Sequence, residues 1–189
     1  KKIFFLSSIA AYGSIKNKVV TENQKSVSPN LYERSKLTSE KLFCKKNNKF
    51  QTICLRLPGI FTLNLKNDYP LIITILKKIL NNENIYTYNS NKKFNNIVDV
   101  NEIVKFINVA LKKKLVISDI YNFSASKPIK FIQVINLIKK KFKSKSKIIN
   151  VTSNKTSFII SNKKMLNNFN FKTSTTKKII VRCCRNIRF

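Results

Sequence analysis

Short apolar runs alternate with segments of helical periodicity along this chain. Residues 3–6 form a continuous apolar run, as in a strand buried on both faces, whereas Leu71, Ile75 and Ile79 recur at helical spacing. The pattern predicts strands at residues 3–7, 51–56, 85–88, 94–98, 119–123, 147–151 and 157–160, and helices at 31–46, 69–80, 101–113, 128–142 and from Ser161. Strands that alternate with helices favour an α/β fold with a parallel sheet.

The helix predicted at residues 31–46 brings two reactive side chains together. Tyr32 and Lys36 are four residues apart, so they lie on one face of a helix. Ser7 and Ser8 follow the first apolar run and are expected at the carboxyl end of a strand, where open α/β sheets bind ligands. A lysine ammonium stabilises a neighbouring phenolate and makes a tyrosine a better base. These residues indicate a proton-transfer site. The alternative is that Tyr32 is simply a half-buried tyrosine and Lys36 a solvated lysine, neither with a catalytic role.

Segments in order along the chain carry a resemblance to a known family. They are Phe4-Phe-Leu-Ser-Ser-Ile-Ala-Ala-Tyr-Gly13, Tyr32-Glu-Arg-Ser-Lys36, Thr52-Ile-Cys-Leu-Arg-Leu-Pro-Gly-Ile60, Phe94-Asn-Asn-Ile-Val-Asp-Val-Asn-Glu-Ile103 and Ile120-Tyr-Asn-Phe-Ser124. With them the chain resembles the extended short-chain dehydrogenase/reductase superfamily, and within it the NAD-dependent nucleotide-sugar epimerase/dehydratase family. The resemblance implies a Rossmann-like parallel sheet with helices on both faces. It also implies that residues 1–60 are the C-terminal half of an NAD-binding domain and that residues 61–189 are mainly a substrate-binding region with interleaved late strands and helices.

The glycine-rich turn of that family has no counterpart in this sequence. Family members begin with a strand and a Gly-x-x-Gly-x-x-Gly turn that lets the backbone approach the cofactor pyrophosphate. The only glycines here are Gly13 and Gly59, which cannot form such a turn. We therefore expect the chain to be the C-terminal part of a longer enzyme, with the adenosine-binding half outside it.

The resemblance assigns roles to four residues and implies NAD or NADP as cofactor. Tyr32 would take a proton from a sugar hydroxyl, and Ser8 would hydrogen-bond the reacting oxygen. Lys36 would activate Tyr32 and also hydrogen-bond the nicotinamide ribose. Pro58 falls where family members place main chain against the nicotinamide, although a proline also simply ends a strand.

Departures from the family pattern narrow the reaction. Sugar 4,6-dehydratases carry an acidic pair where this chain has Ile9 and Ala10, which disfavours dehydration. Reductive epimerases of deoxysugar pathways use a histidine, and this chain has none. A 4-epimerase or a simple oxidoreductase acting on a nucleotide sugar, in surface polysaccharide biosynthesis, is the reaction class that the resemblance then favours. Asn95 stands where many members have a phosphate-binding arginine; it is a candidate substrate ligand, but asparagines there are also common turn formers.

The net charge of +30 is the strongest rival signal, because such an excess is typical of proteins that bind nucleic acid. Arginine, which bidentate recognition of phosphate and guanine favours, occurs only five times, and the lysines are scattered over every predicted helix. We therefore expect no specific nucleic-acid partner. The charge would still attract an anionic ligand such as a nucleotide diphosphate.

Cysteine spacing and hydropathy bear on metals and compartment. Cys44, Cys54, Cys183 and Cys184 lack CxxC spacing, and without histidine we expect no metal site. The same cysteine pattern favours a reduced, cytoplasmic setting. No apolar stretch approaches the roughly 18 to 20 residues that span a bilayer, so we expect no membrane span.

Alternatives from other functional classes stay open at this point. The chain is expected to be part of an enzyme, and the main alternative is a non-catalytic Rossmann-like binding protein. A basic nucleic-acid-binding protein is the least favoured hypothesis. The family resemblance also implies a homodimer in the full-length form, made by the outer face of the helix at residues 31–46.

Overall fold

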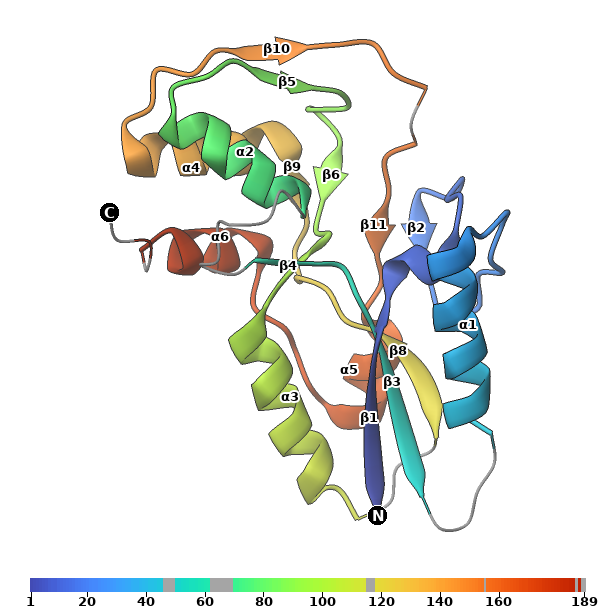
Figure 1. Ribbon diagram of the computed structural model, residues 1–189. Helices are drawn as coiled ribbons and strands as arrows, with labels where there is room; N and C mark the ends of the chain where they lie inside the picture. Colours follow the sequence, from blue (N-terminus) through green and yellow to red (C-terminus); the bar gives the residue numbers. More distant parts are fainter. Residues whose placement is uncertain (46–49, 62–69, 115–117, 155, 186, 188–189) are drawn as a thin grey trace.

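A three-stranded parallel sheet forms the centre of the lower half of the molecule (Figure 1). The computed structural model describes residues 1–45, 50–61, 70–114, 118–154, 156–185 and 187. The sheet has the order β1 (Lys2–Ser8), β3 (Gln51–Leu57) and β8 (Asp119–Asn122), with Phe5 opposite Cys54. Helix α1 (Leu31–Phe43) covers one face, and α3 (Val100–Lys112) and α5 (Lys163–Phe169) cover the other. The predicted Rossmann-like α/β fold with helices on both faces is confirmed.

The two faces of β3 have different chemistry, because successive residues of a strand point to opposite sides. Ile53, Leu55 and Leu57 pack in one apolar cluster with α3 and α5. Cys54 and Arg56 point the other way, where they meet α1. Residues 52–57 are all buried, so β3 is covered on both faces although it carries one cation, Arg56.

A second lobe lies above the sheet and holds its own apolar core. It contains α2 (Leu71–Leu80), α4 (Phe131–Phe142), α6 (Thr176–Arg185) and the parallel pair β5 (Ile85–Thr87) and β10 (Ile148–Asn150). Short strand pairs connect the lobes: β4 (Gly59–Phe61) with β7 (Ile97–Asp99), β2 (Val19–Val20) with β11 (Ile159–Ile160), and the antiparallel β6 (Lys93–Phe94) with β9 (Ile129–Lys130). A 3-10 helix at Ile9–Tyr12 follows β1.

Several predicted elements have different bounds in the structure. The strand predicted at 94–98 is two strands, since Asn95 and Asn96 interrupt it between β6 and β7. The helix predicted at 128–142 begins only at Phe131, because Ile129 and Lys130 pair with β6. The helix predicted at 31–46 ends at Phe43 in the structure, and Tyr69 lies outside the described residues. Helix α6 and strands β2 and β4 were not predicted.

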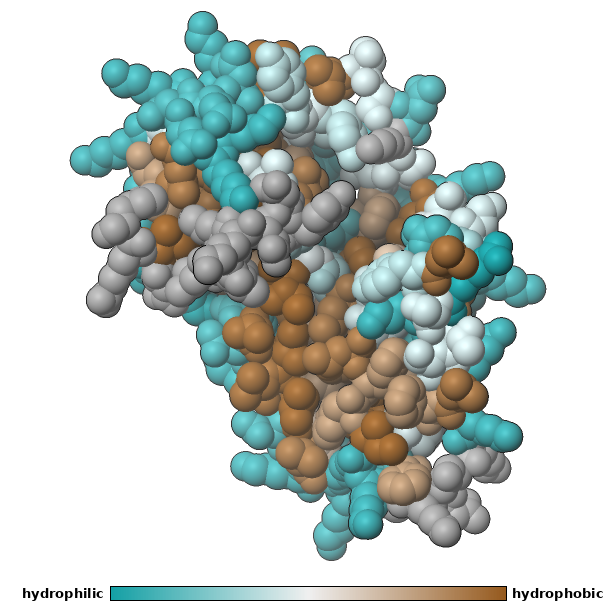
Figure 2. Space-filling model, in the orientation of Figure 1, coloured by the Kyte–Doolittle hydropathy of each residue, from teal (hydrophilic) through white to brown (hydrophobic). Residues whose placement is uncertain are grey.

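Apolar side chains gather on the surface that β1 and α3 present together (Figure 2). Leu6 of β1 and Val104 and Leu111 of α3 are each about half exposed. Within the described part of the chain, β1 pairs with β3 and its outer edge pairs with no strand. The lower half of the molecule therefore presents an open sheet edge beside an apolar surface.

Candidate active site

A cleft of about 930 Å³ opens at the carboxyl ends of β1 and β3. Ser8 comes from the end of β1, Tyr32 from the first turn of α1, and Pro58 and Gly59 from the turn after β3. Three of the residues that the sequence singled out, Ser8, Tyr32 and Pro58, thus line one cavity. It lies at the sheet edge where parallel α/β folds bind ligands.

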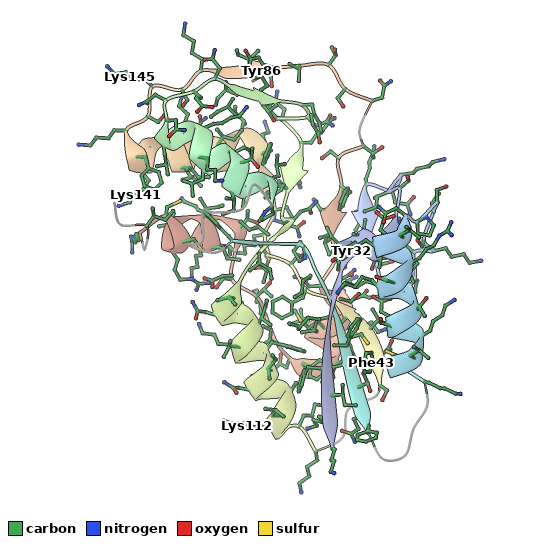
Figure 3. The ribbon with its side chains drawn as sticks, in the orientation of Figure 1. Tyr32, Phe43, Tyr86, Lys112, Lys141 and Lys145 are labelled. Carbon is green, nitrogen blue, oxygen red and sulfur yellow. The ribbon has the colours of Figure 1, made fainter. Side chains whose placement is uncertain are left out.

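Tyr32 owes its position to the way in which α1 begins. Asn30 caps the helix: its side-chain oxygen accepts a hydrogen bond from the Glu33 amide at 3.0 Å, while the Glu33 carboxylate accepts one from the Asn30 amide at 2.8 Å. This reciprocal capping box fixes the first helical turn. Tyr32 is 55% exposed and lies at the end of α1 opposite Phe43 (Figure 3). Its phenol is therefore accessible to a ligand in the cleft.

Lys36 lies one helical turn from Tyr32 and places its ammonium between α1 and β1. Its Nζ is 5.6 Å from the centre of the Tyr32 ring and 5.3 Å from that of Phe5. It also donates a hydrogen bond to the Leu6 carbonyl at 3.3 Å. The cation is thus held beside the tyrosine by two aromatic faces and a main-chain oxygen.

Ser8 joins β1 to the 3-10 helix that follows it. Its hydroxyl oxygen accepts a hydrogen bond from the Ala10 amide at 3.1 Å. This bond uses a lone pair and leaves the hydroxyl proton to be donated to a ligand. Behind it, the buried Tyr12 hydroxyl donates to the Asn122 side chain at 2.7 Å, and burial raises the pKa of Tyr12. The turn that carries Ser8 is therefore anchored to β8.

A buried polar network that sequence reasoning missed holds α1 against the sheet. Arg56 of β3 donates to both oxygens of Glu40, at 2.9 and 2.6 Å, and the Ser7 hydroxyl donates to Glu40 at 2.6 Å. The Arg56 guanidinium also lies 4.4 Å from the centre of the Tyr12 ring. Glu40 follows Lys36 by four residues and so lies on the same face of the helix, and this spacing could have indicated that Glu40 faces the sheet.

Asn95 does not reach the cleft. It is 2% exposed, and its amide nitrogen donates to the carbonyl oxygens of Ala125 and Ile160 at 2.9 and 2.8 Å. Its side-chain oxygen accepts from the Ile160 amide at 2.9 Å. Through these bonds the Asn95 side chain joins β11 to the segment after β8. This structural role accounts for the asparagine at this position, and no ligand is needed to explain it.

A second, smaller pocket of about 150 Å³ adjoins the cleft, and Tyr88, Thr156 and Phe158 line both. Its wall includes Lys92 and Lys93, two cations that sequence reasoning did not select. The sequence feature that could have indicated them is the pair of adjacent lysines directly before Phe94. Asn96 also lines the pocket, and its buried side-chain oxygen has no hydrogen-bond partner among the described residues.

The described part of the chain offers neither a metal centre nor a membrane-spanning helix. No group of three or more His, Cys, Asp or Glu side chains there has an arrangement that could hold a metal ion. None of its helices is both long enough and apolar enough to cross a bilayer.

Comparison with solved structures supports the fold. The RMD protein of Pseudomonas aeruginosa, complexed with NADPH, matches 97% of this chain with a TM-score of 0.77 at 16% identity. A UDP-N-acetylglucosamine 4-epimerase of Methanobrevibacter ruminantium, with UDP-N-acetylmuramic acid, matches 98% with a TM-score of 0.78 at 18% identity. A dTDP-glucose 4,6-dehydratase of Bacillus anthracis, with NAD, matches 97% with a TM-score of 0.75 at 19% identity. This chain spans 65%, 62% and 60% of their respective lengths.

Sequence comparison identifies the family. No curated protein matches the chain at a significant level. Residues 1–123, which include Ser8, Tyr32 and Pro58 of the cleft, match the model of the NAD dependent epimerase/dehydratase family. The chain therefore belongs to the NAD-dependent epimerase/dehydratase family.

Proposed function

We propose that this chain carries the catalytic and substrate-binding residues of an NAD(P)-dependent epimerase or oxidoreductase that acts on a nucleotide sugar. The observation that carries the proposal is the cleft itself, in which Ser8 and Tyr32 face a common cavity with Lys36 beside the tyrosine ring. Family membership and NAD or NADPH in the similar structures support the choice of cofactor.

The residues around the cleft fit a nicotinamide. The cleft has the size of a small-molecule site, and Tyr32, Pro58 and Gly59 are among the residues that line it. Tyr32, Lys36 and Pro58 would hold the ring and its ribose. When bound, a nicotinamide supplies the hydride acceptor and donor for oxidation and reduction of a sugar carbinol.

The chain's own residues would move and hold the proton. Tyr32 takes the hydroxyl proton of the carbinol as its carbon is oxidised, and returns it when the resulting keto sugar is reduced. Ser8 donates its hydroxyl proton in a hydrogen bond to the reacting oxygen. The Lys36 ammonium, 5.6 Å from the ring centre, stabilises the negative charge on the Tyr32 oxygen.

The adjoining pocket supports a nucleotide sugar as the substrate class. Lys92 and Lys93 bring two positive charges to its wall, which suits a diphosphate. The Asn96 side-chain oxygen has no hydrogen-bond partner among the described residues, and a nucleobase N–H or a sugar hydroxyl would supply a donor. The sugar would then lie in the cleft of Ser8 and Tyr32, with the nucleotide in the pocket beyond Tyr88. Asn95, which is occupied elsewhere, has no part in this assignment.

Within this class we favour 4-epimerisation or simple oxidoreduction over 4,6-dehydration. Ile9 and Ala10 follow Ser8 along the cleft wall, and neither side chain can transfer a proton. An epimerase needs no further acid or base, since the keto sugar can rotate and be reduced on its other face. We include a role in surface polysaccharide biosynthesis in the proposal, and this part of it rests on the family resemblance alone.

The proposal also assigns a role to each of two regions of the chain and a homodimer to the full-length protein. Residues 1–60 would serve the cofactor, and residues 61–189 mainly the substrate. The outer face of α1 exposes Leu31 (85%) and Leu42 (69%), three helical turns apart on one side, which supports a homodimer through this helix.

Cofactor and substrate binding test the proposal. NAD and NADP binding would be measured for this chain and for the same reading frame extended upstream, each with Tyr32→Phe and Lys36→Ala, and Lys41→Ala on the exposed side of α1 as the matched control. We expect binding and turnover of nucleotide sugars in the extended form, with turnover lost in both site variants and kept in Lys41→Ala. Absence of nicotinamide binding in every form would leave a non-catalytic binding protein.

A further inference from the structure

Two cysteines from different elements approach each other beneath the helix of the candidate site. The Sγ atoms of Cys44 and Cys54 are 3.1 Å apart. Cys44 is the residue directly after α1, and Cys54 lies in the middle of β3. A disulfide bond has a length of about 2.05 Å, so a shift of roughly 1 Å would join them.

The surroundings hold this pair in place. Phe43, beside Cys44, stacks on Phe5 of β1 with ring centres 4.9 Å apart. One turn earlier, Glu40 is bound to Arg56, two residues from Cys54 on the same face of β3. The end of α1 is thus fixed to β1 through Phe43 and to β3 through Glu40, which keeps the two thiols together.

Accessibility and charge give the two thiols different chemistry. Cys54 is completely buried, whereas Cys44 is partly exposed. The hydrogen bond from Cys54 lowers the pKa of Cys44, and the same contact raises the pKa of Cys54. The charged groups that face Cys44 are Asp119, Glu40 and Lys164. Since the thiolate is the attacking species in thiol–disulfide exchange, Cys44 is the accessible nucleophile and Cys54 the resolving thiol.

We propose that Cys44 and Cys54 form a redox-active dithiol, a modification site that a low-molecular-weight disulfide such as oxidised glutathione converts to an intramolecular disulfide. The Cys44 thiolate attacks one glutathione sulfur, forms a mixed disulfide and releases one glutathione thiolate. The Cys54 sulfur then attacks Cys44, and the second glutathione leaves with the Cys54 proton as a thiol. The protein loses two electrons, and the oxidant gains them.

The bond would act on the helix that carries Tyr32 and Lys36. It would join the end of α1 covalently to the central strand and close the short loop between them, which restricts the unfolded chain. The oxidised protein should therefore be more stable than the reduced one. Because Tyr32 lies three turns away at the other end of α1, this inference stands independently of the proposed catalysis.

Peptide mapping of the chain tests the proposal directly. The protein would be incubated with buffers of increasing oxidised-to-reduced glutathione ratio, alkylated, and digested with trypsin. Lysines at positions 45, 46 and 49 separate the two cysteines, so a disulfide would link Leu42–Lys45 to Phe50–Arg56. The neighbouring Cys183 and Cys184 lie together in a different peptide and serve as an internal control.

Variants separate the pair from the other thiols. We expect the linked peptide and a raised thermal midpoint in the oxidised wild type and in the Cys183→Ser/Cys184→Ser variant, and neither in Cys44→Ser. Cys54→Ser should instead stop at a mixed disulfide on Cys44. If oxidised wild type shows only glutathione adducts, or alkylates at both Cys44 and Cys54 across the whole range of ratios, the proposal is overturned.

Discussion

Glu40 of α1 and Arg56 of β3 form a buried ion pair whose shortest N–O distance is 2.6 Å, with both side chains almost completely inaccessible to solvent. The Ser7 hydroxyl donates to the same carboxylate, so one glutamate links the helix to two strands. This contact sets where α1 lies on the sheet. It therefore sets where Tyr32 and Lys36 stand relative to Ser8.

Removing one partner of this pair should destabilise the protein strongly. Arg56→Met would leave the Glu40 carboxylate buried without its cation, which costs about 3–5 kcal/mol. The free energy of unfolding would be measured by urea denaturation. Lys105 is an exposed lysine 3.9 Å from Glu102, and this carboxylate keeps Arg182 and Ser174 as partners, so Lys105→Ala should cost no more than about 1 kcal/mol. Equal effects of the two substitutions would contradict the structural role of the buried pair.

Gly13 should tolerate no side chain. Its φ is 62°, and an added Cβ would lie 2.1 Å from the Val27 carbonyl oxygen, which accepts a hydrogen bond from Ser14. Gly13→Ala should therefore lose about 1–3 kcal/mol or more in stability, because the turn after Ser8 must move. Thermal unfolding would measure the loss. The neighbouring exposed Ser14→Ala should stay within about 0.5 kcal/mol of wild type, and a Gly13→Ala protein as stable as that control would refute the turn geometry.

Asn95 should prove structural rather than substrate-binding. Asn95→Ala removes the hydrogen bonds to the Ile160 amide and to the carbonyl oxygens of Ala125 and Ile160, of which the Ile160 carbonyl keeps a bond from the Ser124 hydroxyl. Each buried group left without a partner costs on the order of 1–3 kcal/mol. The Michaelis constant for a nucleotide sugar should not change in the extended enzyme at a temperature where the variant stays folded. Lys92→Ala should do the reverse, raising that constant at little cost in stability. A raised constant with unchanged stability in Asn95→Ala would show direct contact with substrate.

Alkaline pH should weaken the packing of α6. Burial raises the pKa of the Cys183 and Cys184 thiols to about 12, from 9.0 for an unburied thiol. Above pH 9 the unfolded chain therefore loses protons that the folded protein keeps, and stability falls as pH rises toward 12, by up to about 1.4 kcal/mol per pH unit for each thiol. Below pH 9 the contribution is fully present.

Denaturation midpoints between pH 8 and 10.5 would show this effect as a steeper decline in wild type than in Cys183→Ala/Cys184→Ala. Both proteins share the other alkaline titrations, such as that of Tyr12, so the difference in slope reports the two thiols. Parallel declines would mean that the two thiols ionise as readily in the folded protein as in the unfolded chain.

Most of the strands and helices could be predicted because their signals are local. The apolar run at Phe4 and Phe5 and the regular spacing of Leu71, Ile75 and Ile79 define their elements without knowledge of the rest of the chain. The meeting of Tyr32 with the serines at the end of β1 followed from local spacing and from the rule that ligands bind at the carboxyl ends of parallel strands, whereas Pro58 and the choice of Ser8 over Ser7 came from the family resemblance.

What escaped prediction depends on contacts between residues distant in sequence. Asn95 takes its role from Ala125 and Ile160, and neither is visible as a partner in the sequence. Helix α6 was missed because its basic residues mask a short apolar face, and Arg182 on it is paired with Asp99 of β7. Since these hydrogen-bond and ion-pair partners come together only in the tertiary fold, the spacing of residues along the sequence could not identify them.

The most direct test of the central claim is hydride transfer by the upstream-extended enzyme from a nucleotide sugar deuterated at the carbinol carbon. Mass spectrometry of the nicotinamide would detect the deuterium. We expect transfer in wild type and a rate about 10²–10⁴-fold lower in Tyr32→Phe, with nicotinamide still bound. Transfer in Tyr32→Phe at the wild-type rate would contradict the assignment of Tyr32 as the base.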